Sequence, residues 1–531
     1  MSVTHPSRRR HLSRRRHLAP LLALGVTAAL VPQLALQSAS AAASAAEPPA
    51  HQLAPYTGQK LTWKPCAADL PATLQCATLK VPLDYRRPDG KRIDIAISRA
   101  ETSVPGKRRG IMAFNPGGPG GPGLDFPDMA AKELPKQVTE RYDLIGFDPR
   151  GVGESTPVTC GLGGTDLSFP RPNRSRQEFD ANTAWSKKVA RACRARAGGL
   201  LPHITTRNTA RDMDVMRAAL GEKKLSYYGL SYGSALGAAY MQLFPGRADR
   251  FVVDSAIDSR RMWRGMYRIW APSSERAFER WAKWTAERAS VYHLGGTPKR
   301  VRGAFWMLVK RAEREPIELD GVKYDGAGIR DLMRAQFVKV RQSAELVVKL
   351  KKAASGQSVP PGPAAPPAAP PGDNAAVSQW AVVCADGSDW PRDVATYRRD
   401  VVRDSARYPL YGDFVSGTSP CAYWPRAAET AGPVSNRVPS LIVQNEWDPQ
   451  TPLASARSLH RDLKGSRLVT VRGGEGHSVR FYTDTRNACA DRQVDAYLIT
   501  GELPREDVTC QAAPDARKRL AAAPPLFGLG V

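Results

Sequence analysis

Short apolar segments alternate with amphipathic ones along most of the chain, and this alternation predicts strands and helices in turn. A Pro-Asp-Gly turn separates two alternating patterns at 74–85 and 92–102, which predict an antiparallel hairpin. Further strands are predicted where short runs are mostly apolar, at 111–114, 142–147, 225–230, 250–256, 438–449 and 467–471. Helical patterns lie between or beside them, at 208–220, 233–244 and 453–463. Apolar strands that alternate with helices predict an α/β fold with a mostly parallel sheet covered on both faces.

This alternation stops between residues 258 and 435. The stretch contains eight of the eleven tryptophans and three helical patterns, at 273–289, 298–313 and 328–353. It also contains a proline-rich segment at 359–372, whose composition is typical of an exposed polyproline-like spacer. Because strands and helices alternate again afterwards, we interpret 258–435 as a large, mainly helical cap inserted after the sixth strand. The two parts of the core would then be 47–257 and 436–531.

The first residues form a basic, then apolar, then small-residue segment. Six arginines lie at 8–10 and 14–16, an interrupted apolar run spans 18–36, and alanine and serine dominate 38–47. This order predicts a secretory signal peptide over residues 1–46. A membrane anchor is the alternative, which the prolines within the apolar run disfavour.

Composition and charge limit the classes of protein that remain. Apolar residues are 42% and charged residues 24% of the 531, as in globular proteins, and a single long apolar stretch excludes a polytopic membrane protein. The net charge of +26 would still be +20 without the six N-terminal arginines. The other basic residues are scattered, which indicates solvated surfaces and no nucleic-acid partner. Binding to anionic cell-wall polymers stays open, and no stable membrane association is expected after signal cleavage.

The chain contains eight cysteines, an even number that predicts disulfides in an exported protein. No cluster of cysteine and histidine has metal-binding spacing, so we expect neither a metal nor a cofactor. Taken in order along the chain, the cysteines form four pairs that each lie within one region. We favour this sequential pairing: Cys66 with Cys76, Cys160 with Cys193, Cys384 with Cys421 and Cys489 with Cys510.

A candidate nucleophile lies in the segment Gly-Leu-Ser-Tyr-Gly at 229–233, between a predicted strand and a predicted helix. This is the context of a nucleophile elbow, a sharp turn that presents a serine at the end of a sheet. A purely structural glycine-rich turn is the alternative. We predict Ser231 as the nucleophile and the N–H of Tyr232, at the helix N-terminus, as an oxyanion donor.

A serine hydroxyl needs a general base, and three histidines follow it: His293, His460 and His477. His477 lies in a glycine-rich loop just after a predicted strand, where a ring could reach the serine, and it is our candidate. Asp448 ends the preceding predicted strand and is the candidate acid, with Glu446 as the alternative. The order serine, aspartate, histidine is that of the α/β-hydrolases.

A second oxyanion donor is expected from the loop after the third strand. The segment Asn-Pro-Gly-Gly-Pro-Gly-Gly at 115–121 lies there, and Gly117 and Gly118 are the candidate donors. The glycine spacing could also suggest a dinucleotide site. However, the prolines in this segment remove amides that a phosphate would need.

Five segments together resemble the secreted tripeptidyl aminopeptidases of actinomycetes, in the prolyl-aminopeptidase-like branch of the α/β-hydrolases. They are NPGGPGG (115–121), DLIGFDPRGVGES (143–155), NTARDMD…LGEKKLSYYGLSYG (208–233), NEWDPQTP (445–452) and GEGHSV (474–479). The resemblance implies the α/β-hydrolase fold, with Ser231 as nucleophile, Asp448 as acid and His477 as base. It also implies that the substrates are peptides with a free N-terminus.

We therefore expect a secreted serine exopeptidase that releases short peptides, in particular tripeptides. The alternatives are a secreted esterase or lipase with the same triad, and an inactive protein that binds wall polymers. An exopeptidase must hold the substrate ammonium, and a buried ammonium needs carboxylate partners. Glu446 and Glu154 on core loops and Glu279 in the cap are the candidates for this role.

Overall fold

A computed structural model describes residues 50–336, 339–359, 372–483 and 486–512 of the chain. The expected signal peptide and nearly all of the proline-rich segment lie outside these residues. No helix within them is long and apolar enough to cross a membrane. The described residues all belong to one compact unit, so the cap and the core are described together.

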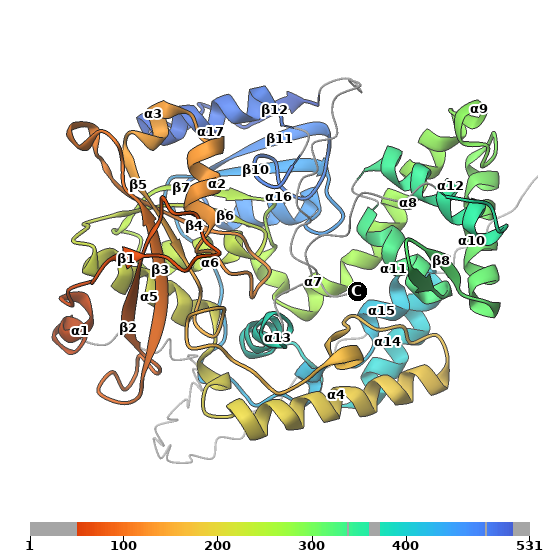
Figure 1. Ribbon diagram of the computed structural model, residues 1–531, viewed down its shortest axis with the longest axis horizontal. Helices are drawn as coiled ribbons and strands as arrows, with labels where there is room; N and C mark the ends of the chain where they lie inside the picture. The colour runs from red at the N-terminus through yellow and green to blue at the C-terminus, as the bar shows by residue number, and fades with distance from the viewer. Residues whose placement is uncertain (1–49, 337–338, 360–371, 484–485, 513–531) are drawn as a thin grey trace, which may run out of the picture. The chain divides into compact units, whose positions relative to one another are not determined.

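Ten strands of the described residues form one sheet in the order β1-β2-β3-β5-β4-β6-β7-β10-β11-β12 (Figure 1). The first three pairs in this order are antiparallel and the other six are parallel. The strands are β1 (Lys64–Pro65), β2 (Gln75–Pro82), β3 (Arg92–Ala100), β4 (Gly110–Asn115), β5 (Tyr142–Phe147), β6 (Leu225–Leu230), β7 (Ala248–Asp254), β10 (Ser440–Trp447), β11 (Ser466–Glu475) and β12 (Val508–Gln511). The predicted mostly parallel sheet is therefore confirmed.

Alternate residues of the central strands enter two apolar clusters on opposite faces of the sheet. In β6, Tyr227 belongs to one cluster and Tyr228 to the other, as a period of two requires. The first cluster includes residues of α5 (Thr206–Ala219), α6 (Tyr232–Leu243) and α16 (Leu453–Asp462). The second includes residues of α2 (Phe126–Glu133), α3 (Lys136–Thr139) and α17 (Ala488–Thr500). Both faces are thus covered by helices, which is why the central strands are apolar throughout.

The cap is inserted between two strands that are neighbours in the sheet, β7 and β10, where Phe251 pairs with Ser440. Strand β7 is the sixth strand when the two-residue β1 is left out, as expected. The inserted elements are α7 (Arg264–Arg268), α8 (Trp270–Ala286), α9 (Ala289–Tyr292), α10 (Pro298–Arg314), β8 (Ile317–Leu319), β9 (Val322–Tyr324), α11 (Gly326–Gln336), α12 (Val340–Ala354), α13 (Asn374–Asp386), α14 (Val394–Arg407), α15 (Gly412–Ser416) and the 3₁₀ helix η5 (Pro420–Tyr423). Helices α8, α10, α11 and α12 share a separate apolar core.

Several predicted helices have different bounds in the structure, and the one expected at 273–289 is α8, three residues earlier at each end. The pattern at 328–353 is not one helix but two, α11 and α12, because Lys339 has extended backbone angles (φ −139°, ψ 108°) at a point that neither glycine nor proline marks. The helix expected at 208–220 begins at Thr206 and is capped by the hydroxyl of Thr205, which accepts the N–H of Asn208.

Helix α4 (Arg176–Ala197) was not predicted from the sequence, although Ser175 and Glu178 form a capping box at its start. It lies along the bottom of the view in Figure 1, next to α14. Asn182 of α4 donates to the carbonyl of Thr418, and Asp180 forms an ion pair with Arg398 of α14. A segment that precedes residue 257 therefore packs on the cap. The short α1 (Ala50–Thr57) begins the described chain.

The eight cysteines form four disulfides in the structure, and these are the sequential pairs that the sequence favoured. The bonds are Cys66–Cys76, Cys160–Cys193, Cys384–Cys421 and Cys489–Cys510. The third bond joins α13 to η5, so it stabilises the part of the cap that packs against the glycine-rich loop at 115–121 (below).

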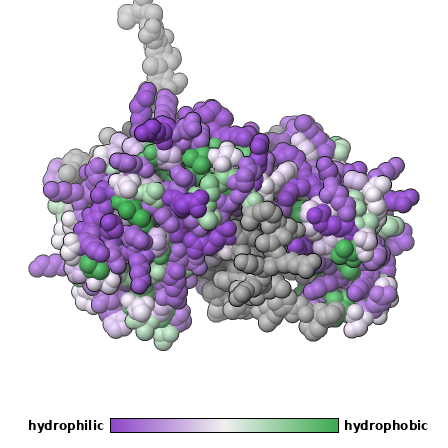
Figure 2. Space-filling view, turned by 90° about the horizontal axis from the view of Figure 1, so that it is seen from above, coloured by the Kyte–Doolittle hydropathy of each residue, from purple (hydrophilic) through white to green (hydrophobic). Residues whose placement is uncertain are grey.

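The surface is mainly polar. Figure 2 shows hydrophilic residues over most of one face, with apolar residues only in scattered spots. Large apolar side chains that are exposed in the described residues lie apart along the chain: Val291, Met307, Val322 and Val402. Isolated exposed apolar residues are normal for a soluble surface and do not indicate a docking site.

Candidate active site

Ser231 lies in a sharp turn between β6 and α6. Its φ of 53° and ψ of −116° are sterically unfavourable for a residue with a side chain. The turn is held by a hydrogen bond from the Ser231 N–H to the carbonyl of Asp254 (2.9 Å). A Cβ on Gly229 would lie 2.4 Å from the carbonyl oxygen of Gly233, so strand and helix approach each other here at a distance that only glycine allows. This is the geometry of a nucleophile elbow.

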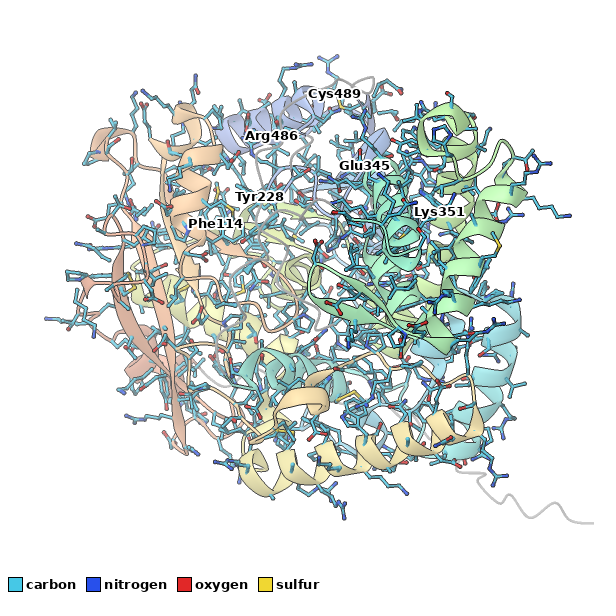
Figure 3. The ribbon with its side chains drawn as sticks, turned by 45° about the vertical axis from the view of Figure 1, so that its right-hand side comes forward. Phe114, Tyr228, Glu345, Lys351, Arg486 and Cys489 are labelled. Atoms are coloured by element: carbon cyan, nitrogen blue, oxygen red, sulfur yellow. A yellow bond between two sulfur atoms is a disulfide. The ribbon has the colours of Figure 1, made fainter. Side chains whose placement is uncertain are left out.

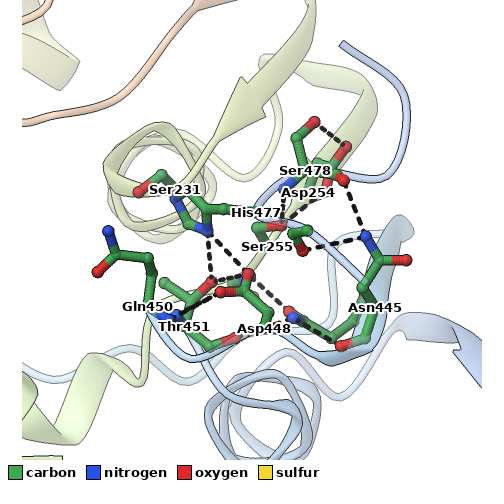
Figure 4. Close-up of polar contacts among 12 residues, drawn as sticks. Ser231, Asp254, Ser255, Asn445, Asp448, Gln450, Thr451, His477 and Ser478 are labelled. Carbon is green, nitrogen blue, oxygen red and sulfur yellow. Dashed lines mark hydrogen bonds and ion pairs between the residues drawn. The ribbon is translucent and has the colours of Figure 1, made fainter. Parts of the chain in front are cut away.

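His477 and Asp448 meet next to this turn (Figure 4). Asp448 immediately follows β10, and His477 follows the end of β11 by two residues. The His477 Nδ1 and the Asp448 Oδ2 are 2.8 Å apart. The Asp448 side chain has no exposed surface. It also accepts the N–H of Gln450 (2.8 Å) and both the N–H and the hydroxyl of Thr451 (3.1 and 2.8 Å). These bonds orient the carboxylate toward the imidazole.

Burial lowers the pKa of His477, but the charge of Asp448 and its hydrogen bond outweigh this effect, so the pKa is raised above the ordinary 6.5. Because Nδ1 donates its proton to Asp448, Nε2 is left as the acceptor. Figure 4 shows Ser231 beside the His477 ring, with no hydrogen bond drawn between them. Such bonds are often long without substrate and shorten when substrate binds.

Asp254 joins the nucleophile and the histidine loop, a role that was not predicted from the sequence. Its carbonyl accepts the Ser231 N–H, while its buried carboxylate accepts the Ser478 hydroxyl (3.1 Å), the Val479 N–H (3.0 Å) and the Tyr228 hydroxyl (3.0 Å). Asp254 ends β7, the strand next to β6, and an acid at the carboxyl end of a neighbouring strand is the signal that could have identified it.

Two further contacts hold the histidine loop. The Asn445 side-chain amide donates to the carbonyls of Gly476 (3.1 Å) and Ser478 (2.9 Å). Phe481 then packs into the second apolar cluster, where its ring centroid is 4.9 Å from that of Tyr228 and 6.4 Å from that of Phe114. Figure 3 labels the latter two in the interior of the molecule. His477 is therefore positioned from both sides along the chain.

The glycine-rich loop 115–121 lies directly against Ser231. A Cβ on Gly117 (φ 95°) would be 2.5 Å from the carbonyl of Leu230 and 2.9 Å from the Cβ of Ser231. The expectation that the Gly117 N–H serves as an oxyanion donor needs correction, because this N–H donates to Asn115 Oδ1 (3.1 Å). Gly117 is therefore required for its small size, because a side chain at this position would collide with Leu230 and Ser231. The N–H groups of Gly118 and Tyr232 have no acceptor within the described chain and remain the candidate donors.

Helix α13 of the cap contacts both oxyanion elements. A Cβ on Gly120 would lie 2.6 Å from Ser378 Oγ, so the helix touches the glycine-rich loop. At the end of α13, Asp386 accepts the N–H of Thr206 (2.9 Å), whose hydroxyl is also 2.9 Å from the Tyr232 hydroxyl. Burial raises the pKa of Asp386 to about 6. The position of Tyr232 thus depends on the cap as well as on the core.

The three glutamates considered for the substrate ammonium lie in other surroundings. Glu279 forms an ion pair with Arg302, and 55% of its side chain is exposed. Glu446 accepts the N–H of Gly473 (2.7 Å), and Glu154 is exposed. The structure does not bring these three carboxylates into one buried group.

Asp331 of α11 is a cap carboxylate that the sequence analysis missed. Burial raises its pKa, and its one hydrogen bond in the described structure comes from the Tyr411 hydroxyl (2.6 Å). Arg334, one turn further along α11, donates to the side chain of Gln450 beside Asp448. Asp331 therefore lies on a helix that contacts the Asp448 loop. Its place in an unbroken helical pattern gave no sequence signal.

A serine on a nucleophile elbow, an Asp–His pair after two later strands and a mostly parallel sheet define a serine hydrolase with the α/β-hydrolase fold. Residues 111–291 match the family model described as alpha/beta hydrolase fold, and residues 408–510 match the model described as TAP-like protein. The first match contains Ser231 and the glycine-rich loop, while the second contains Asp448 and His477.

Relatives with named activities indicate which family of serine hydrolases the chain belongs to. The chain is 36% identical over 478 residues to a tripeptidyl aminopeptidase of Streptomyces lividans, which covers 86% of this chain and 88% of that protein. It is 30% identical over 503 residues to the serine protease Hip1 of Mycobacterium tuberculosis, covering 86% and 92%. It is 31% identical over 523 residues to carboxylesterase B of the same organism, covering 92% and 97%. The chain belongs to the tripeptidyl aminopeptidase family of α/β-hydrolases.

Proposed function

We propose that this protein is a secreted serine exopeptidase that removes tripeptides from free N-termini through an acyl-enzyme. The observation that carries the proposal is the buried Asp448–His477 pair beside the strained Ser231, in a chain whose relatives include named tripeptidyl aminopeptidases. The signal-like segment and the four disulfides support secretion, since disulfides persist in oxidising compartments.

In the first half-reaction His477 Nε2 takes the hydroxyl proton of Ser231 as Oγ bonds to the substrate carbonyl carbon. The tetrahedral oxyanion accepts hydrogen bonds from the N–H groups of Tyr232 and Gly118. The carbon–nitrogen bond then breaks as His477 returns the proton to the leaving amine. In the second half His477 deprotonates a water, which attacks the acyl carbon, and Ser231 regains its proton as the peptide leaves.

Asp448 has two roles in this scheme. It accepts the Nδ1 proton, which keeps Nε2 free for the serine, and its charge stabilises the imidazolium that forms in each transition state. Each well-placed oxyanion donor adds about 3–4 kcal/mol of transition-state stabilisation. The glycine-rich loop and the start of α6 would supply these donors without reorganisation.

Exopeptidase specificity requires a receptor for the substrate ammonium. Glu279 is already paired with Arg302, and Glu154 is exposed. Glu446 is partly buried, and its carboxylate is already engaged by the N–H of Gly473. Asp331 is also partly buried, and it fits better because it forms no ion pair within the described residues and lies one turn from the arginine that contacts the Asp448 loop. An arriving ammonium would give this carboxylate a direct, charge-assisted partner in addition to the nearby charges of Arg330 and Arg334.

Esterase activity is the second candidate, because a relative of similar length is named carboxylesterase B. Ester and amide hydrolysis use the same acyl transfer, so a matched pair of substrates separates them. We expect a tripeptide p-nitroanilide to be cleaved as well as its intrinsically more reactive p-nitrophenyl ester. Hydrolysis of the ester alone would replace the peptidase proposal by the esterase proposal.

The ammonium receptor is tested separately. Asp331→Asn should raise KM for the tripeptide substrate with a free N-terminus and leave hydrolysis of an N-acetylated ester unaffected.

A further inference from the structure

Two cap residues form hydrogen bonds with the loop that contains Asp448. Trp270 of α8 donates its Nε1–H to the carbonyl of Gln450 (2.8 Å), and Arg334 of α11 donates to the side-chain oxygen of the same residue. The N–H of Gln450 in turn donates to Asp448 Oδ1 (2.8 Å). The residue that helps to orient the acid is therefore held from the cap and not only from the core.

Arg334 is in an unusual position for a charged residue. It is 4% exposed, forms no ion pair with a carboxylate in the described chain, and its Nε has no acceptor there. Its guanidinium lies 3.9 Å from the ring centroid of Trp270 and 5.2 Å from that of Tyr411. A buried cation without a carboxylate partner is costly. Aromatic stacking offsets only part of that cost, which suggests a role beyond stability.

We propose that Arg334 is a positioning residue that couples docking of the cap to activation of Ser231, by fixing Gln450 and placing a positive charge near the Asp448–His477 pair. This inference rests on the proposed serine-hydrolase mechanism. It implies that contacts within the core are not enough to position Asp448 and His477. A shift of α8 and α11 relative to the core would therefore change the reactivity of Ser231.

The charge of Arg334 has a definite effect on His477. Three charged groups act most strongly on the pKa of this histidine: Asp448 from the β10 loop, Asp254 from the end of β7 and Arg334 from α11. The two carboxylates raise the pKa of His477 and Arg334 lowers it. Removing the positive charge should therefore raise the pKa, so that His477 stays protonated, and inactive as a base, up to a higher pH.

The test measures how fast a fluorophosphonate probe labels Ser231 between pH 5 and pH 9, together with kcat and KM for a tripeptide substrate. Arg334→Met keeps the apolar stem and removes the charge. We expect its labelling rate at pH 7 to fall by about 10- to 100-fold. The acid limb, the low-pH part of the curve where labelling slows as His477 becomes protonated, should move to higher pH. The loss should appear in kcat, with KM little changed. Arg334→Lys should keep the acid limb near its original pH and recover part of the rate.

Two further variants separate this role from a structural one. Gln450→Leu removes the acceptor of Arg334 from the core side while keeping the backbone bonds of Gln450, and it should slow labelling in the same direction. Its combination with Arg334→Met should not be additive. Arg174 is the control, since it lies over the ring of Trp306, forms an ion pair with Glu313 and donates to the Pro409 carbonyl, and none of these residues belongs to the Asp448 loop. Arg174→Met should leave labelling and its pH dependence unchanged.

The outcomes are distinct. The inference would be overturned if folded Arg334→Met is labelled at the wild-type rate with an unchanged acid limb and only a lower Tm. If Arg334→Met does not fold, unchanged labelling of Gln450→Leu would overturn it instead. A wild-type protein that is labelled but cleaves no peptide refutes the proposed peptidase function and leaves this inference to be decided by the labelling rates. A wild-type protein that is not labelled refutes both.

Discussion

Replacing Asp448 by asparagine changes one atom of a carboxylate that is completely buried. Oδ1 accepts the N–H groups of Gln450 and Thr451, and the asparagine oxygen can keep both bonds. Oδ2 accepts the Thr451 hydroxyl and the His477 ring, and here an NH₂ group would replace an acceptor. The Thr451 hydroxyl can reverse its direction and accept, since a hydroxyl is both donor and acceptor. We therefore expect Asp448→Asn to fold with a Tm close to that of the wild type.

The effect on catalysis should be large because the histidine tautomer changes. The asparagine NH₂ donates to Nδ1, so the ring proton moves to Nε2 and this nitrogen can no longer accept the proton of Ser231. The same change of tautomer in a trypsin-like triad lowers kcat by about 10⁴-fold. That factor corresponds to roughly 5.5 kcal/mol of activation free energy, and we expect a loss of the same order here.

The assay is steady-state hydrolysis of a chromogenic tripeptide amide, with circular dichroism and Tm to show that each variant is folded. Glu446→Gln is the matched control, because Glu446 ends the same strand and its carboxylate accepts the N–H of Gly473 instead of a histidine. The control should keep activity within a few-fold. A loss smaller than 10-fold in folded Asp448→Asn, or a larger loss in Glu446→Gln, would show that the acid has been wrongly assigned.

Three further predictions follow from the same geometry. Since the pKa of His477 is raised above 6.5 and catalysis needs the neutral ring, kcat/KM should fall as the pH drops through a midpoint above 6.5; a midpoint near 5 would contradict the assignment. Gly117→Ala would place a Cβ 2.5 Å from the Leu230 carbonyl and should reduce kcat by about 100-fold, whereas Gly163→Ala, with no atom within 4 Å of its new Cβ, should be neutral; equal effects would refute the close approach. Mass mapping of unreduced peptides should find all eight cysteines in the four sequential pairs, and a free thiol or a bridge between regions would disprove this.

Central elements of the fold were predictable because they are buried on both faces. The strand predicted at 142–147 is β5 (Tyr142–Phe147), and the one at 225–230 is β6 (Leu225–Leu230), both at their observed bounds. Continuous apolar runs of this length between turn residues leave little choice of structure. Ser231, Asp448 and His477 could be chosen because each lies at or just after the end of a predicted strand, and parallel strands bring their carboxyl ends to one edge.

Features that depend on contacts between distant segments could not be read from the pattern. Asp254 matters because the histidine loop, more than 220 positions later, folds onto its carboxylate. The N–H of Gly117 is taken by Asn115, which local spacing does not reveal. Arg334 lies within an ordinary amphipathic helix, and only the docking of that helix places it against Gln450. Helix α4 was missed because its buried face has few large apolar residues and includes Asn182 and Ser186.

The central claim is that Ser231 attacks peptides that are held by their free N-terminus. The most direct measurement is mass spectrometry of the products from one unblocked peptide of about eight residues and from its N-acetylated form, with wild-type protein and Ser231→Ala. We predict release of the N-terminal tripeptide from the free peptide, a decrease of at least about 100-fold in kcat/KM on acetylation, since a charge-assisted contact is lost, and no turnover by Ser231→Ala. Equal cleavage of the two peptides, or activity in purified Ser231→Ala, would contradict the account.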